Sequence, residues 1–327
     1  MKITNKMINK SVRFRGILVR TVWPKFTVSK FNFCRFCLEN FVKKIPLTNK
    51  ITKKDIYIER PDNTKLRCCL YYKKDKETLD KNMLSTGLLW IHGGGYAIGI
   101  PEHDFMFIEN FVLNTNTVVL APDYTKSLVK PFPAALDDCY LALKYLLDNS
   151  EKYNINQNQI FVGGNSAGGG LTVALSLLAR DKKEVNIACT FPLYPMIDCN
   201  NTSTNYNNDA PVWNSYSNKV AWDLYLNGTS RNNISKYASP SLETDYSNLP
   251  PVFTYIGTID PFYEETINYL NRLKENNIET NCKEFAGCFH GFDIVGFDTK
   301  VGKEAATYLL DCYLYAVKHF YKKNERK

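Results

Sequence analysis

The sequence predicts an α/β fold in which a mostly parallel sheet is flanked by helices on both faces. Short continuous apolar runs alternate along the chain with stretches of helical periodicity. Strands that are buried on both faces and alternate with helices are typical of such a sheet. The predicted strands contain Leu88–Ile91, Val118–Leu120, Ile160–Val162, Ile187–Leu193 and Val252–Ile256, with a further strand near 281–285. The predicted helices lie near residues 103–114, 134–148, 167–180, 261–276 and 302–321.

Length and composition exclude several other classes of protein. The 327 residues are 44% hydrophobic and 23% charged, which provides a full core and rules out a disordered chain. No apolar run approaches the roughly 18 residues that a membrane-spanning helix needs. A polytopic membrane protein, a coiled coil, a collagen-like rod and a low-complexity linker are therefore excluded.

Residues 1–54 differ from the rest of the chain in charge. They contain 14 Lys and Arg but a single acid, Glu39, whereas the remainder carries a net charge of −5. This basic segment fits either a solvated polar face or contact with an anionic phospholipid surface. Nucleic acid is not an expected partner, because no nucleic-acid-binding motif is present.

Apolar residues three and four apart in the same segment predict two helices that lie on another surface. One stripe is Phe14, Ile17, Leu18 and Val22, and the other is Cys34, Cys37, Leu38, Phe41, Val42 and Ile45.

Two further segments complete the predicted organisation. Ile56, Ile58 and Leu66–Tyr72 predict a strand pair with Pro61–Asn63 as its turn. The stretch 198–237 is rich in Asn and Ser and contains no obvious strand. We expect it to be an insertion that lies over the carboxyl edge of the sheet.

The cysteines predict a reducing compartment. Cys34 and Cys37 form one CxxC pair, and Cys68 and Cys69 are adjacent, but neither pair has partners at zinc spacing. Six others lie in apolar stretches and are expected to be buried thiols: Cys139, Cys189, Cys199, Cys282, Cys288 and Cys312. A secretory signal is not expected, since arginines interrupt the N-terminal apolar stretch. The predicted location is the cytoplasm, with organelle targeting or peripheral membrane attachment as alternatives.

One motif indicates a serine nucleophile. Gly164-Asn165-Ser166-Ala167-Gly168 fits Gly-x-Ser-x-Gly, follows the predicted strand 160–163 and opens a predicted helix. Such a turn holds the Ser hydroxyl at the top of the sheet, and glycines are needed where a Cβ would collide with backbone. The alternative is a glycine-rich turn that merely feeds a helix.

A second glycine motif ends an earlier strand. In His92-Gly93-Gly94-Gly95, consecutive glycines let backbone N–H groups point into one cavity, where they would stabilise the oxyanion of acyl transfer. A phosphate-binding loop is the alternative, but no Gly-Lys-Ser/Thr or dinucleotide fingerprint follows.

A serine nucleophile needs a base and an acid. His290 lies in a loop after the strand near 281–285, which suits a base better than His92, His103 or His319. Asp260 directly follows the strand 252–256, although Glu264, Glu265, Asp293 and Asp298 are also nearby in sequence. The order Ser166, Asp260, His290 is the order of an α/β-hydrolase.

Together these motifs resemble the hormone-sensitive-lipase-like carboxylesterases. His92–Gly95, Gly164–Gly169, Asp260-Pro261 and His290–Phe292 carry the resemblance, with Asp123-Tyr124, Pro131–Ala135 and Tyr194-Pro195 in support, over roughly residues 55–320. The resemblance implies an eight-stranded α/β-hydrolase core, with a helical cap formed by residues 1–54 and by a segment at about 198–238. It implies Ser166 as nucleophile, His290 as base and then acid, Asp260 as the orienting acid, and the N–H groups of Gly94, Gly95 and Ala167 as oxyanion donors. No metal or organic cofactor is implied.

The chain departs from that family at two places. The family usually has Asp where Asn165 stands, and Arg-Leu-Ala-Pro-Glu where this chain has Thr125–Val129. Our hypothesis is that an acid and a base have been lost together, which avoids one unpaired buried charge.

The predicted function is hydrolysis of short- to medium-chain acyl esters through an acyl-enzyme. The substrate is then a small-molecule ester. The alternatives are an amidase or deacetylase with the same catalytic parts, a membrane-associated lipase, and a receptor that has lost catalysis. No oligomeric state follows from the sequence.

Overall fold

The computed structural model describes residues 2–44, 48–74, 84–200, 208–230 and 233–324. Within them, one eight-stranded sheet has the order β1-β2-β4-β3-β5-β6-β7-β8. The strands β3 to β8 run parallel to one another, and β2 pairs antiparallel with both β1 and β4. Their bounds are β1 Ile51–Glu59, β2 Lys65–Lys73, β3 Ser85–Ile91, β4 Thr117–Pro122, β5 Ile155–Asn165, β6 Cys189–Leu193, β7 Val252–Gly257 and β8 Thr280–Phe285. The predicted mostly parallel sheet is confirmed.

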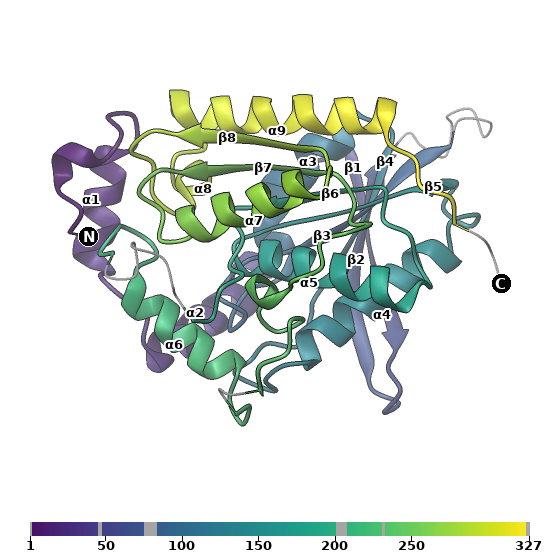
Figure 1. The fold of residues 1–327 in the computed structure, drawn as a ribbon, viewed down its shortest axis with the longest axis horizontal. Coiled ribbons are helices and arrows are strands. Elements are labelled where there is room, and N and C mark those ends of the chain that lie inside the picture. Colours follow the sequence, from purple (N-terminus) through teal and green to yellow (C-terminus); the bar gives the residue numbers. More distant parts are fainter. Residues whose placement is uncertain (1, 45–47, 75–83, 201–207, 231–232, 325–327) are drawn as a thin grey trace.

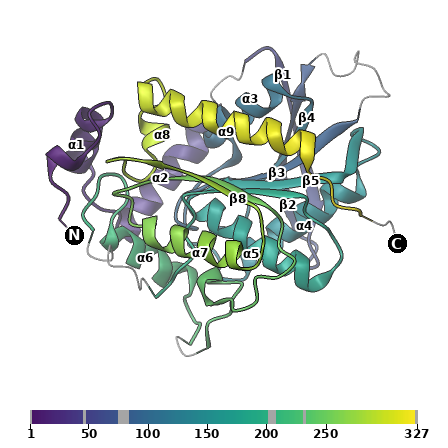
Figure 2. The ribbon, with the colours of Figure 1, turned by 45° about the horizontal axis from the view of Figure 1, so that its top comes forward.

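Helices cover both faces of this sheet (Figure 1). The helices α3 and α9 lie on one face with the short α8, and α4, α5 and α7 lie on the other (Figure 2). Their bounds are α3 Phe105–Asn114, α4 Ala134–Asp148, α5 Ala167–Lys182, α7 Tyr263–Glu275, α8 Phe292–Val295 and α9 Lys300–His319. The 3-10 helix η4, Pro101–Asp104, leads into α3. The predicted layers of helix, sheet and helix are therefore confirmed.

Burial explains why the central strands are apolar runs. Every residue of β3, β4, β6 and β7 is buried, so no polar alternation appears in their sequences. The edge strands β1 and β8 alternate instead between buried or half-buried and exposed positions. At β1 the strand begins at Ile51, so it starts within the N-terminal segment that the sequence analysis bounded at residue 54.

Three helices gather at one end of the molecule, at the left of Figure 1. They are α1, Arg13–Val22; α2, Val28–Asn40; and α6, Ser215–Tyr225. The indole of Trp213, just before α6, lies 5.6 Å from the ring of Phe26 between α1 and α2. The predicted insertion thus contributes a helix, and its residues 201–207 and 231–232 lie outside the described residues, as does Ile45 of the predicted N-terminal stripe.

The predicted stripe of α1 is oriented differently from expectation. Of its four residues, Ile17 packs half-buried against the core, as expected. Phe14, Leu18 and Val22 are exposed, and for these three the expectation that they lie on another part of the chain is wrong. Gly16 is the buried residue of this helix. On α2, Cys34, Cys37 and Leu38 are half-buried, whereas Phe41 is exposed.

All ten cysteines are free thiols. Five of the six that were expected to be buried are buried, and Cys282 on β8 is half-buried. None of the helices in the described ranges is long and apolar enough to cross a bilayer.

Candidate active site

Ser166 lies at the sharp turn from β5 into α5. Its backbone is held at φ 55° and ψ −120°, a conformation that costs a residue with a side chain about 1–3 kcal/mol. Two hydrogen bonds fix it: the Ser166 N–H donates to the Leu193 carbonyl at 2.9 Å, and its own carbonyl accepts from Met196 N–H at 3.1 Å. A Cβ at Gly164 or at Gly168 would lie 2.3 or 2.0 Å from the Ile91 carbonyl oxygen. The Gly-x-Ser-x-Gly spacing is therefore a packing requirement of this turn.

Three residues that are distant in sequence meet at this turn. His290, after β8, places its Nε2 2.8 Å from Ser166 Oγ and its Nδ1 2.8 Å from Asp260 Oδ2. Asp260 follows β7, and its other carboxylate oxygen accepts the Phe262 N–H at 2.8 Å. All three side chains are buried. The structure thus brings together the three residues that were predicted to form a Ser-His-Asp triad.

The other candidate acids have different partners. The Glu265 carboxylate accepts the Ile197 N–H at 2.8 Å, and Asp298 pairs with Arg15. Asp293 accepts the hydroxyls of Tyr255 and Tyr194, at 2.6 and 3.0 Å. Of the candidates that the sequence left open, Asp260 is therefore the one that bonds to His290.

The loop His92–Gly95 follows β3 and lies against Ser166. A Cβ at Gly93 would be 3.2 Å from the Ser166 Cβ. Gly94 and Gly95 have φ values of 118° and 59°, which favour glycine. Within the described ranges, their N–H groups donate to no backbone carbonyl. The N–H of Ala167, the first residue of α5, has no partner within its helix either. The loop and the helix start therefore offer backbone donors beside the serine.

His92 supports this loop and stays neutral. Its Nδ1 lies 2.8 Å from the Gly93 carbonyl oxygen, and its ring stacks on Tyr124 with centroids 4.2 Å apart. Burial lowers the pKa of His92 well below its usual value, and the charges of Lys126 and His103 lower it further. A neutral ring packed this way shapes the glycine loop rather than titrating.

The loop that carries His290 is held by the N-terminal segment. The Asn9 backbone N–H donates to the Gly287 carbonyl at 2.7 Å, and its side-chain amide donates to the Ala286 carbonyl at 2.9 Å. On α1, a Cβ at Gly16 would lie 2.6 Å from the ring of Phe289. The position of the imidazole therefore depends on the first helix of the chain.

Comparison with known proteins accounts for this arrangement. A family model for the alpha/beta hydrolase fold matches residues 88–294, which is well over half of the chain. This chain belongs to the hormone-sensitive-lipase-like carboxylesterase family. The resemblance that the motifs predicted is confirmed, and the matched range includes the glycine loop, Ser166, Asp260 and His290.

Individual relatives are distant in sequence. An alpha/beta hydrolase of Acanthamoeba polyphaga mimivirus is 27% identical over 63% of this chain and 60% of its own length. An arylesterase of Saccharolobus solfataricus is 28% identical over 63% of this chain and 67% of its own. The chain spans only 60 and 62% of the mimivirus protein and of a Schizosaccharomyces pombe hydrolase. Among solved structures, a bacterial heroin esterase has a TM-score of 0.85 at 26% identity, and the match covers 94% of this chain and 98% of that one.

The departures from the carboxylesterase family have separate partners in the structure. The Asn165 amide donates to the buried carboxylate of Asp104 at 2.6 Å. Thr125 donates its N–H and its hydroxyl to Asp138, at 2.8 and 2.7 Å, and the guanidinium of Arg60 pairs with the same carboxylate. That an acid and a base were lost together stays a hypothesis, since these contacts show only the partners of the residues now present. An acid at 165 would face Asp104, and Arg60 supplies a base beside Thr125 from the β1–β2 turn.

Aromatic rings surround His290. The rings of Phe262 and Tyr194 meet the imidazole edge-on, with centroids 4.9 and 5.0 Å away, and Trp213 is 6.1 Å away. Phe26 and Phe31 pack on the far side of Trp213. Sequence reasoning missed Phe26, Phe31 and Phe262, because no periodic pattern marks rings that come from a linker, a cap helix and a loop.

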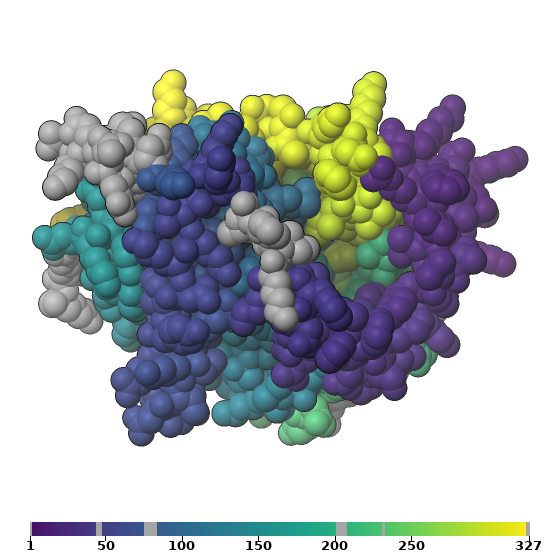
Figure 3. Space-filling model, turned by 180° about the vertical axis from the view of Figure 1, so that it is seen from behind, coloured from purple at the N-terminus to yellow at the C-terminus, as the bar shows by residue number. Residues whose placement is uncertain are grey.

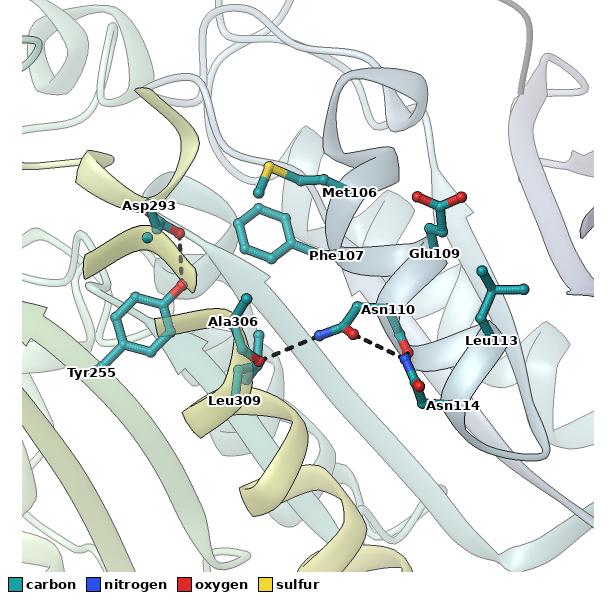
Figure 4. Close-up of a pocket in the computed structure, with 11 residues that line it drawn as sticks. Met106, Phe107, Glu109, Asn110, Leu113, Asn114, Tyr255, Asp293, Ala306 and Leu309 are labelled. Atoms are coloured by element: carbon teal, nitrogen blue, oxygen red, sulfur yellow. Dashed lines mark hydrogen bonds between the residues drawn. The ribbon is translucent and has the colours of Figure 1, made fainter. Parts of the chain in front are cut away.

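Asp293 forms a second buried polar group behind this wall. Burial raises its pKa, although the two tyrosine hydroxyls oppose that change. Its Oδ1 has no hydrogen-bond partner among the residues that the structure describes. The carboxyl borders a cavity of about 300 Å³ between α3 and α9, which Met106, Phe107 and Leu309 also line (Figure 4). Through Tyr194, this carboxyl helps to fix the ring that contacts His290.

A cluster of two carboxylates and a thiol, separate from the Ser166 site, has the composition of a metal site. The ligand atoms of Asp55, Cys69 and Glu102, on β1, β2 and η4, lie within 4.8 Å of one another. Cations already occupy it, because Glu102 pairs with Arg67 at 2.8 Å and with Lys53 at 2.5 Å. Burial would raise the pKa of Glu102, but these two cations lower it to about 2. Burial raises the pKa of the Cys69 thiol to about 12, so the cluster fits an ion-pair network better than a metal ion.

Proposed function

We propose that this protein is a serine carboxylesterase that hydrolyses short- to medium-chain acyl esters. The observation that carries the proposal is the buried line of hydrogen bonds from Ser166 Oγ through His290 to Asp260, with both distances at 2.8 Å. Nucleophile, base and orienting acid are the parts that acyl transfer needs. Membership of the carboxylesterase family supports the same reaction.

In the proposed reaction, Ser166 Oγ attacks the ester carbonyl carbon while His290 Nε2 takes the hydroxyl proton. Asp260 holds the Nδ1–H and stabilises the imidazolium. The carbonyl oxygen becomes an oxyanion that accepts the N–H groups of Gly94, Gly95 and Ala167. The bond to the alcohol then breaks, and His290 returns the proton to the departing oxygen. Water attacks the acyl-serine by the same route, which releases the acid and restores Ser166.

The helical end of the molecule acts as the cap, with α1 and α2 from the N-terminal segment before β1 and α6 from the segment at about 198–238. Trp213 is in contact range of Gly95, since a Cβ there would lie 2.5 Å from the indole. An indole pressed on the oxyanion loop limits the room for a long acyl chain, and the surrounding rings favour apolar ester groups. The arylesterase and heroin esterase relatives support such substrates.

Hydrolysis of p-nitrophenyl acetate, butyrate, octanoate and palmitate tests the proposal. We expect rates that are highest on the shorter chains and a loss of about ten-thousandfold in Ser166→Ala. Ser176→Ala is the matched control, because Ser176 is buried in the same helix and its hydroxyl bonds only to the Val173 carbonyl. Full activity in Ser166→Ala, or no activity of the folded protein on any of the four esters, contradicts the proposal.

A further inference from the structure

The outward face of α1 is apolar. Phe14, Leu18 and Val22 follow one another at four-residue intervals and keep 78, 51 and 67% of their surface exposed. Arginines of the same helix contact the body: Arg15 pairs with Asp298 and donates to the Val295 carbonyl at 2.9 Å, and Arg20 donates to the Ile3 carbonyl at 2.7 Å. The helix is therefore attached to the body by these arginines, by Gly16 against the Phe289 ring and by the half-buried Ile17.

The exposed apolar surface continues from α1 onto α2. At the end of α1, Trp23 stacks on Phe33 with ring centroids 6.3 Å apart. Phe36 lies one turn further along α2, and its ring is 6.2 Å from that of Phe41. Phe33, Phe36 and Phe41 are all more than half exposed. We call this surface the apolar ridge; its members are Phe14, Leu18, Val22, Trp23, Phe33, Phe36 and Phe41.

Lysines accompany the ridge. Figure 3 shows the N-terminal region, in purple, as one side of the molecule with side chains that project outward. Exposed cations of the region include Lys2, Lys6, Lys10, Lys25 and Lys43. Its single acid, Glu39, is paired with Arg35 at 2.8 Å. The N-terminal region that carries the ridge is therefore strongly positive, and Lys30 lies over the Trp23 ring of the ridge itself, 4.6 Å from its centroid.

The apolar ridge and the lysines of the same region together favour one kind of binding partner over another. Aromatic and aliphatic side chains beside lysines suit the boundary between lipid headgroups and acyl chains, where the lysines reach anionic phosphates. A second copy of the chain would bring an equal positive charge against the first, and like charges oppose that contact.

We propose that the apolar ridge docks the protein on the surface of an anionic phospholipid bilayer. Phe14, Val22 and Phe36 enter the headgroup boundary, and the flanking lysines bind the lipid phosphates. The attachment is a property of α1 and α2 and does not require the ester chemistry at Ser166.

Co-sedimentation with vesicles tests this docking. The probes are vesicles of phosphatidylcholine with phosphatidylserine and vesicles of phosphatidylcholine alone. We expect the full-length protein to sediment mainly with the anionic vesicles and to be released by about 1 M salt, which screens the lysines. The triple variant Phe14→Ser, Val22→Ser, Phe36→Ser should lose at least about tenfold in partitioning.

A matched variant separates the ridge from general surface hydrophobicity. Tyr57→Ser, Val129→Ser, Tyr321→Ser removes side chains that are 59, 63 and 59% exposed outside the ridge, and it should sediment as the natural protein does. An unchanged thermal melt shows that both variants are folded. The proposal is overturned if the natural protein stays in the supernatant with both vesicle types, or if the two variants lose binding equally. It is also overturned if light scattering shows a dimer that only the ridge variant disperses, because the occupant is then a second copy.

Discussion

The helices α5 and α1 carry apolar residues in opposite settings. In α5, 12 of the 16 residues are buried, and the helix begins at Ala167, directly after Ser166. In α1, Gly16 is the buried residue, and the apolar stripe points outward. An apolar stripe in the sequence thus predicts that a helix has an apolar face, but it does not predict whether another part of the chain covers that face. Arg15, Gly16 and Ile17 attach α1 to the body, whereas α5 is held by close backbone contacts.

The largest expected effect is on kcat, at the hydrogen bonds that join Asp260 and His290 to Ser166, just before α5. Asp260→Asn should lower kcat by about ten-thousandfold with little change in stability, because the amide no longer stabilises the imidazolium of His290. Asp293→Asn is the matched control, since Asp293 contacts Tyr194 and Tyr255 rather than the imidazole, and its kcat should stay within about tenfold. Steady-state hydrolysis of p-nitrophenyl butyrate measures both. Equal losses of kcat in the two variants would contradict the assignment of Asp260, rather than Asp293, as the acid that supports His290.

Two glycines sharpen the comparison between the helices. Gly168→Ala should lower the free energy of unfolding by about 3 kcal/mol, because its Cβ would lie 2.0 Å from the Ile91 carbonyl oxygen. Gly16→Ala meets the edge of the Phe289 ring, which can move, and should cost about 1 kcal/mol. Urea denaturation of both variants measures the difference. A larger cost at Gly16 would show that α1 is packed as rigidly as α5.

A buried ion pair and an exposed ion pair are expected to contribute differently to stability. The pKa of Glu102 is lowered to about 2 in the folded protein, so its pairing stabilises the fold above its ordinary pKa of about 4.5 and loses that effect as pH falls toward 2. Glu102→Gln should therefore cost up to about 3 kcal/mol at pH 7 and progressively less between about pH 5 and pH 2.

The exposed pair that tethers α1 provides the control. Asp298→Asn removes the partner of Arg15 at the surface and should change the unfolding midpoint little at any of these pH values. Urea midpoints across the pH series measure both variants. A cost of Glu102→Gln that is independent of pH would mean that the carboxylate is not held by its cations.

The smallest expected effect lies on the ridge. Phe14→Ser should change the free energy of unfolding by less than about 0.5 kcal/mol, because the ring is 78% exposed and has little burial to lose. Leu171→Ser, a buried position of α5, is the contrasting variant and should cost several times more. A clear destabilisation by Phe14→Ser would indicate that the stripe is covered in solution.

Local sequence patterns predicted the fold closely, and they identified the three residues that come together at the candidate active site. The helix expected near 134–148 is observed as Ala134–Asp148, because its amphipathic stripe faces the sheet that the strands themselves indicate. Ser166, Asp260 and His290 were identifiable because each follows a strand whose carboxyl end lies at the same edge. The resemblance implied a helical cap segment at about 198–238, but the bounds of α6 within it were not predicted, since the stretch is rich in polar residues. The Asn165–Asp104 and Arg60–Asp138 contacts join distant segments and leave no trace in local sequence.

The bonds from Asn9 to residues 286 and 287 also set an order of events during synthesis. The Asn9 side chain and its partner at Ala286 are separated by 277 positions, so all of the intervening residues must be made before this bond can form. Chains fold as they emerge, from the N-terminus onward. The strands β1 to β7 can therefore be made while the N-terminal segment still lacks this contact, and the Ser166–His290 bond cannot form until the loop at 286–290 has emerged.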